Sequence, residues 1–129
     1  MRRVRKWMSS LAPIMNAFVV EDDPTLASTL MDAMVAFGIT VIGHAGDVPS
    51  ALAWLDKGLI PDLALIDILL PSGPAYPIVD RLRELPTALV LITGLDCTQI
   101  KTPYRDITCL EKPFGMHELL EAITNLVDR

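Results

Sequence analysis

Asp67 is the residue whose surroundings first indicate chemistry. It follows the apolar run 63–66, so it is predicted to lie at the carboxyl end of a buried strand, the edge where open α/β sheets place their sites. A carboxylate there is costly to bury unless it is paired or bound to a cation. Asp22 and Asp23 follow a second apolar run, 17–20, in the same way. The three carboxylates together indicate a cation site.

Apolar and amphipathic patterns predict the elements that position these residues. The predicted strands are 16–21, 39–44, 63–67, 88–93 and 107–110. The predicted helices run from Pro24 to a stop at Gly38, from an N-cap at Asp47 to Gly58, from Ile78 to Leu85 and from Met116 to Val127. Segment 94–106 is weakly patterned and contains Pro103, so a full helix is not expected there. This alternation predicts an α/β fold with a parallel sheet covered on both faces and all strand ends along one edge.

Three further polar residues fall at the same predicted edge, namely Glu21, Thr93 and Lys112. Each of these features has a plain structural alternative. The acidic residues before Pro24 could cap a helix, Thr93 could be a turn residue, and Lys112 could be a solvated charge. Only the combination points to a functional site.

Four motifs at the predicted strand ends carry that combination: Val19-Val20-Glu21-Asp22-Asp23-Pro24, Leu65-Ile66-Asp67 with Pro71 beyond it, Ile92-Thr93-Gly94 and Glu111-Lys112-Pro113-Phe114. In their order and spacing they resemble the receiver domain of bacterial two-component response regulators. The resemblance covers residues 15–129. It implies a flavodoxin-like, doubly wound sheet of five parallel strands in the order 2-1-3-4-5.

The resemblance also implies a role for each matching residue. Asp67 would be the nucleophile that becomes an aspartyl phosphate. Lys112 would pair with one phosphoryl oxygen, the Thr93 hydroxyl would bond another, and the Lys112–Pro113 peptide bond would be cis, as is common in the family. Mg²⁺ would be held by Asp22, Asp23, Asp67 and the backbone carbonyl of Leu69. Without the ion, at least one clustered carboxyl group is expected to have a raised pKa.

The chain departs from the family pattern in its last third. Receivers usually carry an aromatic residue three positions before the lysine, where this chain has Cys109; its nearest aromatic is Tyr104. The stretch 93–112 is short, which indicates a degraded or missing fourth helix. With Pro74-Ala75-Tyr76-Pro77 and Leu91-Ile92-Thr93-Gly94, these features resemble the stand-alone receivers of the FATGUY type. We therefore expect signalling by ordering of a loop rather than by rotation of an aromatic ring.

Two apolar residues occupy positions that influence hydrolysis of the acyl phosphate in this family. Leu69 and Leu95 follow Asp67 and Thr93 by two residues and cannot hydrogen-bond the attacking water. Slow self-dephosphorylation is therefore expected. Local packing of both leucines is the alternative.

Charge is distributed unevenly along the 129 residues. The net charge is −5, yet Arg2, Arg3, Arg5 and Lys6 supply four of the eleven basic residues, so residues 15–129 carry −9. An acidic body is a poor general binder of nucleic acid. Residues 1–14 are expected to be a disordered basic extension, or sequence upstream of a start at Met15, with a weak membrane or partner contact as the alternative. No apolar stretch approaches the ~20 residues of a membrane span.

Cys97 and Cys109 are twelve residues apart and have no His or Cys companion at metal-binding spacing. We expect them to be free thiols in a reducing cytoplasm, and the protein to be cytoplasmic.

Three classes of function follow from these residues. The first is a single-domain response regulator that accepts a phosphoryl group on Asp67 from a sensor histidine kinase or a histidine phosphotransfer protein. Its output would be contact with a downstream protein, or it would act as a phosphate sink, and it would not be a turnover enzyme. The second is an adaptor that keeps the receiver fold without phosphorylation. A phosphatase with an aspartate nucleophile ranks last, because Leu69 replaces the second aspartate such enzymes typically need. No Gly-rich Lys-Ser/Thr loop supports a nucleotide-hydrolysing enzyme. The kinase, the output partner and the oligomeric state cannot be named from the sequence.

Overall fold

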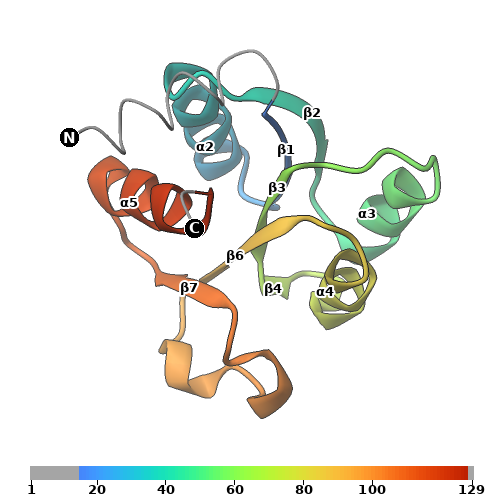
Figure 1. The fold of residues 1–129 in the computed structure, drawn as a ribbon. Coiled ribbons are helices and arrows are strands. Elements are labelled where there is room, and N and C mark those ends of the chain that lie inside the picture. The colour runs from blue at the N-terminus through green and yellow to red at the C-terminus, as the bar shows by residue number, and fades with distance from the viewer. Residues whose placement is uncertain (1–14, 128–129) are drawn as a thin grey trace.

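The structure, a computed structural model, describes residues 15–127; the predicted extension 1–14 lies outside them. Its main sheet has five parallel strands in the order β2-β1-β3-β6-β7 (Figure 1). The strands are β1 Asn16–Val20, β2 Thr40–Ala45, β3 Leu63–Asp67, β6 Ala88–Thr93 and β7 Thr108–Glu111. This order confirms the predicted 2-1-3-4-5 topology. A small antiparallel hairpin follows β3. Its two strands, β4 (Leu69–Leu70) and β5 (Gly73–Pro74), have two residues each.

Helices cover both faces of the sheet (Figure 1). The core on one face contains side chains of α2 and α5, and the core on the other contains side chains of α3 and α4. The helices are α2 Pro24–Ala36, α3 Val48–Leu55, α4 Tyr76–Arg83 and α5 Met116–Val127. Successive β1 residues alternate between the two cores: Phe18 and Val20 pack on the α3 and α4 side, and Ala17 and Val19 pack on the α2 and α5 side.

Strand β3 forms the centre of the molecule. All five of its residues are buried, and it is paired on both sides, with β1 and with β6. A strand covered on both faces reads as a continuous apolar run, which is why 63–66 contains no polar residue. Burial of each large side chain contributes about 1.5–3 kcal/mol. The position of Asp67 is therefore fixed by the most buried strand of the sheet.

The helix ends follow the predicted signals. Asp23 is the N-cap of α2 and Asp47 is the N-cap of α3, where its carboxylate accepts the Ser50 N–H at 2.8 Å. Gly38 and Gly58 follow these two helices with φ angles of 83° and 86°, a region that favours glycine.

The 94–107 segment, which connects β6 to β7, contains no α-helix. It forms two short 3₁₀ turns, Cys97–Gln99 and Thr102–Tyr104, as the weak pattern predicted. Side chains attach it to α4: the Tyr104 hydroxyl donates to Asp80 at 2.7 Å, and the Tyr104 ring lies 4.5 Å from that of Tyr76.

Among the described residues, no helix is long and apolar enough to cross a membrane.

Candidate functional site

Three polar side chains are buried at the carboxyl edge of the sheet. They are Glu21, Asp67 and Thr93, with exposed fractions of 1%, 3% and 0%, and they complete or follow strands β1, β3 and β6. In the described part of the chain, no other polar or charged residue is this buried. Because burial of polar groups is costly without partners, this edge must satisfy them locally.

Lys112 is the main partner of the two carboxylates. It follows β7, and its Nζ lies 2.8 Å from Asp67 Oδ2 and 3.2 Å from Glu21 Oε1. Its backbone N–H donates to the Thr93 carbonyl at 2.7 Å, which holds the end of β7 against the end of β6. The Lys112–Pro113 peptide bond is cis, as the resemblance implied.

Both oxygens of Asp67 are oriented. Oδ2 accepts from Lys112, and Oδ1 accepts the Leu69 N–H at 3.0 Å. Two hydrogen bonds on one carboxylate, one of them from a charged lysine, fix the plane of the Asp67 side chain. Leu69 was predicted as a metal ligand through its carbonyl, and that role stays a prediction.

The electrostatics of the site favour an additional cation. Burial raises the pKa of the Glu21 carboxyl; the hydrogen bond from the Asp23 N–H opposes this rise, and the nearby charge of Asp67 adds to it. The raised pKa is thus found at Glu21, which lies outside the predicted set of Asp22, Asp23 and Asp67, and its main cause is burial. Burial lowers the pKa of Lys112, but the hydrogen bond and charge of Asp67 outweigh this, so the pKa of Lys112 rises and the lysine stays charged.

The acidic cluster differs in one residue from the predicted set. Oxygens of Glu21, Asp22 and Asp67 lie within 4.8 Å of one another. The Asp23 carboxylate instead accepts the Thr25 N–H at 3.0 Å, so the structure places Asp23 at the helix cap, which was the structural alternative for the acidic pair. As the N-cap, Asp23 has an extended backbone immediately before Pro24. The two preceding acids, Glu21 and Asp22, therefore lie at the end of β1.

The cluster fits a hard divalent ion. Its donors are all carboxylate oxygens, which suit Mg²⁺. Glu21 Oε1 is buried and has no hydrogen bond, although Lys112 Nζ lies near it. A buried carboxylate oxygen that has a charged neighbour but no hydrogen bond, beside two other carboxylates, is the kind of atom that a bound cation satisfies.

Thr93 lies at the end of β6, next to the strand that carries Asp67. Its Oγ1 accepts the Leu95 N–H at 2.9 Å, which leaves the hydroxyl hydrogen free to be donated. The structure therefore brings together Asp67, Lys112 and Thr93 from three separate strand ends. Glu21 joins them, and the prediction had mentioned it only as part of the strand-1 motif.

The prediction of free thiols is wrong. Cys97 and Cys109 form a disulfide, with Cα atoms 6.2 Å apart, and no free cysteine occurs in the structure. The sequence spacing of twelve residues gave no sign of this. The 94–107 segment turns back through two 3₁₀ turns, and this return brings the Cys97 backbone beside β7.

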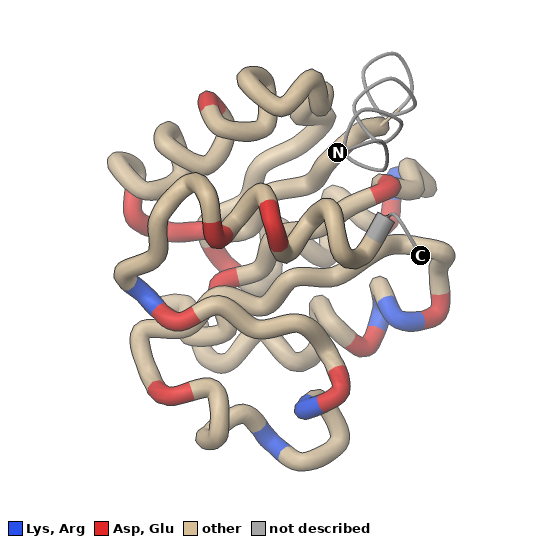
Figure 2. The backbone as a smooth tube through the Cα atoms, turned by 60° about the vertical axis from the view of Figure 1, so that its left-hand side comes forward, with Lys and Arg blue, Asp and Glu red and all other residues tan. Residues whose placement is uncertain are grey.

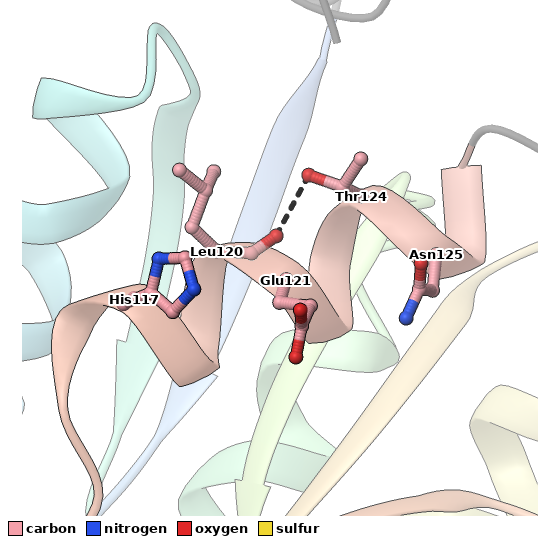
Figure 3. A pocket seen from close by; sticks show the side chains of 5 residues that line it. All are labelled: His117, Leu120, Glu121, Thr124 and Asn125. Atoms are coloured by element: carbon pink, nitrogen blue, oxygen red, sulfur yellow. Dashed lines mark hydrogen bonds between the residues drawn. The ribbon is translucent and has the colours of Figure 1, made fainter. Parts of the chain in front are cut away.

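A second hollow lies on α5, apart from this site. Figure 3 shows its lining side chains, His117, Leu120, Glu121, Thr124 and Asn125, along one face of the helix. The Thr124 hydroxyl donates back to the Leu120 carbonyl at 2.7 Å, so it is already satisfied. One isolated imidazole and one carboxylate do not form a catalytic arrangement, and the strand-end cluster remains the candidate site.

Comparison with known proteins agrees with this geometry. Residues 17–124 match the sequence profile described as the response regulator receiver domain. The chain is 32% identical over 114 residues to the transcriptional regulatory protein DltR of Streptococcus agalactiae, an alignment covering 84% of this chain and 50% of that protein. It is 27% identical over 123 residues to the probable C4-dicarboxylate response regulator DctR of Halalkalibacterium halodurans, covering 87% of this chain and 51% of the relative. The chain thus spans about half the length of these curated relatives.

Solved structures share the fold. The solution structure of SdrG from Sphingomonas melonis Fr1 is 29% identical, with a TM-score of 0.76, and the alignment covers 88% of this chain and 97% of SdrG. TrrA from Thermotoga maritima, solved in complex with Mg²⁺ and beryllium fluoride, has a TM-score of 0.76 at 20% identity, over 88% of this chain and all of that one. The predicted family is confirmed, while the FATGUY subgroup stays a prediction. The chain belongs to the response regulator receiver domain family.

Proposed function

We propose that this receiver domain accepts a phosphoryl group on Asp67 from a phosphohistidine of a sensor kinase or phosphotransfer protein, with Mg²⁺ required. The observation that carries the proposal is a 3% exposed aspartate whose two oxygens are held by Lys112 and by the Leu69 N–H. A purely structural ion pair would not need the additional acidic cluster with an unsatisfied oxygen. The geometry supports phosphoryl transfer because positioning and charge neutralisation do most of the catalysis in such reactions.

Each residue has a definite task in the proposed reaction. An oxygen of Asp67 attacks phosphorus, the bond between phosphorus and the histidine nitrogen breaks, and the nitrogen leaves with its electron pair. Lys112 then pairs with a phosphoryl oxygen instead of the Asp67 carboxylate alone, and the free hydrogen of the Thr93 hydroxyl is donated to another. When bound by Glu21, Asp22 and Asp67, Mg²⁺ supplies positive charge against the phosphoryl oxygens.

The proposed output is contact with another protein, in the cytoplasm, or storage of phosphate. The described surface favours a protein partner over nucleic acid: Figure 2 shows acidic positions spread along the chain and few basic ones, in line with the charge of −9 on residues 15–129. The domain takes part in its own phosphorylation but is not a turnover enzyme.

The lifetime of the phosphorylated form is expected to be long. Leu69 and Leu95 are 44% and 46% exposed, and both line a hollow beside Thr93. Apolar side chains at these places cannot orient the attacking water. A half-life of seconds for the acyl phosphate would contradict this.

Intact mass after incubation with a small phosphodonor and Mg²⁺ tests the proposal. We expect a gain of one phosphoryl group that is absent in Asp67→Asn, a variant of matched size that lacks the nucleophile. The Asp106→Asn variant, which removes an exposed carboxylate of the 94–107 segment, should still be modified. No mass gain in the unmodified chain would overturn phosphorylation and favour the adaptor function.

A further inference from the structure

The disulfide joins the two segments that carry the phosphoryl-binding side chains. Cys97 lies four residues after Thr93, and Cys109 lies three residues before Lys112. The Cys97 N–H also donates to Glu111 Oε2 at 2.8 Å, so the same pair of segments is held by a hydrogen bond. Because Cys109 lies within β7, which is paired with β6, a change in this covalent bond acts on the residues that follow Thr93 rather than on the pairing of the two strands.

Few other interactions constrain the segment between the two cysteines. Within 97–107 only Ile100 is buried, and no residue there belongs to the sheet. The long-range contacts are this buried side chain, the packing of Tyr104 and Ile107 against the core, and exposed polar pairs such as Tyr104 with Asp80. Exposed pairs of this kind contribute little. The disulfide adds a covalent restraint to one buried side chain and a set of exposed contacts.

The sulfur atoms can be reached by a reactant. Cys97 and Cys109 are both half-buried and line a surface hollow of about 580 Å³. Lys112 and Pro113 line the same hollow, together with Glu118 at the start of α5. A dithiol that enters this hollow therefore approaches the disulfide from the side of the phosphorylation site.

We propose that Cys97–Cys109 is a reversible thiol–disulfide site that sets the affinity of the domain for its phosphoryl group. The inference rests on the proposed phosphorylation of Asp67. In the cytoplasm, the location proposed above, a disulfide is uncommon and is usually transient or redox-sensing, which favours a regulatory role over a purely structural one.

The reductant belongs to the class of dithiol proteins. One thiolate of the dithiol attacks a sulfur of the disulfide, the sulfur–sulfur bond breaks, and a mixed disulfide forms with release of one cysteine thiolate. The second thiol of the dithiol displaces the other cysteine. Two electrons and two protons are transferred in total: this domain gains two thiols, and the dithiol becomes a disulfide.

Oxidation favours the phosphorylated state. The ladder between β6 and β7 holds the two strand ends in either redox form, and the closed disulfide in addition orders the residues after Thr93, including Leu95, whose N–H fixes the Thr93 hydroxyl oxygen. Reduction releases the segment, and binding must then order it again. Because coupling between two equilibria is reciprocal, an occupied phosphoryl site must also make the disulfide harder to reduce.

The test measures this coupling in both directions on the full chain. Mg²⁺ with beryllium fluoride serves as the phosphoryl mimic, and its dissociation constant is measured for the oxidised and the dithiol-reduced protein. The equilibrium of the disulfide with a small dithiol is measured with and without the mimic, by alkylation of thiols and intact mass. We expect tighter mimic binding by at least about fivefold in the oxidised form, and the same factor in the redox equilibrium.

The Cys97→Ser/Cys109→Ser variant is the control. It should bind the mimic like the reduced protein under both conditions. Equal affinities of oxidised and reduced protein, or a disulfide that the dithiol does not reduce in the folded chain, would overturn the inference while phosphorylation of Asp67 stands. Failure of both redox forms to take up a phosphoryl group would overturn the proposed function and this coupling together.

Discussion

The strand-end site and the 94–107 segment are neighbours held in opposite ways. The site rests on strands: Glu21, Asp67 and Thr93 are almost completely buried and are placed by paired β-strands. The segment has no strand or α-helix, and it is held by one buried side chain, Ile100, by exposed side chains and by one disulfide. Figure 1 shows it at the border of the fold beside β7, outside the layers of helices.

In the proposed function, this difference separates the groups that would transfer the phosphoryl group from the segment that would report its presence to a partner. The groups that would perform phosphoryl transfer are positioned by the core and cannot move without disturbing it. The segment that follows Thr93 can reorganise at small cost, because few buried contacts hold it. A receiver that lacks an aromatic switch residue, as this one does at Cys109, thus still has an element that can change state.

The largest expected effect tests whether the core carries the site. Leu65→Ala, in the fully buried strand β3, should lower the free energy of unfolding by about 2–5 kcal/mol. Ile107→Ala, at a half-buried position of the segment, should cost only about 1 kcal/mol. Urea unfolding measures both. Equal losses would contradict the contrast between the two regions.

Removal of a lysine provides a second comparison. Lys112→Met leaves Asp67 and Glu21 without their counter-charge, so we expect a loss of about 1–3 kcal/mol and phosphoryl uptake slower by at least about tenfold. Lys101→Met, the matched change in the segment, removes a cation 5.0 Å from the Tyr76 ring and should leave uptake unchanged. Unfolding curves and time courses of intact mass measure the two effects. Similar uptake by both variants would show that the site does not depend on Lys112.

Removal of one acidic charge distinguishes Glu21 from Asp23. Glu21→Gln should weaken Mg²⁺ binding by about tenfold, whereas Asp23→Asn, which keeps a capping side chain, should change it little. Calorimetric titration measures both. The reverse order would favour the predicted metal role of Asp23 over that of Glu21.

The same Glu21→Gln variant predicts a pH dependence. The pKa of Glu21 is raised in the folded state, so its contribution to stability is present below its ordinary value of 4.5 and is lost as the pH rises through the folded pKa. Without Mg²⁺, the variant should therefore gain stability relative to the unmodified chain as the pH rises to neutrality. Urea midpoints at pH 4 and pH 7 measure this difference, and a loss at neutral pH would contradict it.

The smallest effect concerns the segment alone. Tyr104→Phe removes the hydrogen bond to Asp80, so amide exchange across residues 98–107 should become faster while overall stability and phosphoryl uptake hardly change. Exchange measured by mass spectrometry tests this. A phosphoryl mimic should in turn slow exchange across residues 94–108, and unchanged protection there would contradict signalling by loop ordering.

Much of the fold follows from local patterns. The predicted boundaries of β3, β6 and α5 agree with the structure. Burial on both faces imposes a continuous apolar run on the two strands, and burial of one face imposes a 3.6-residue period on the helix. The helix stops at Gly38 and Gly58 agree because positive φ angles favour glycine. The lack of an α-helix in the 94–107 segment was likewise visible in the sequence, as missing periodicity around Pro103.

The positions of individual polar groups were harder to predict from the sequence. Asp22 and Asp23 are adjacent acids in sequence, and only the cap geometry at Thr25 separates their roles. The orphaned oxygen of Glu21 depends on how β1, β3 and β7 end beside one another. A linear pattern contains no information on these distances.

The sequence by itself determined the class of this protein, because the apolar strands and the polar residues at their ends repeat a pattern that burial and phosphoryl chemistry both require. The tertiary structure alone decided which acids meet and how the cysteines pair. Carboxylates contribute to a site only when oxygens come within a few ångströms, and two thiols can bond only when the chain folds their Cα atoms to about 6 Å. The bond between Cys97 and Cys109, which are twelve residues apart in the sequence, is the clearest product of that folding.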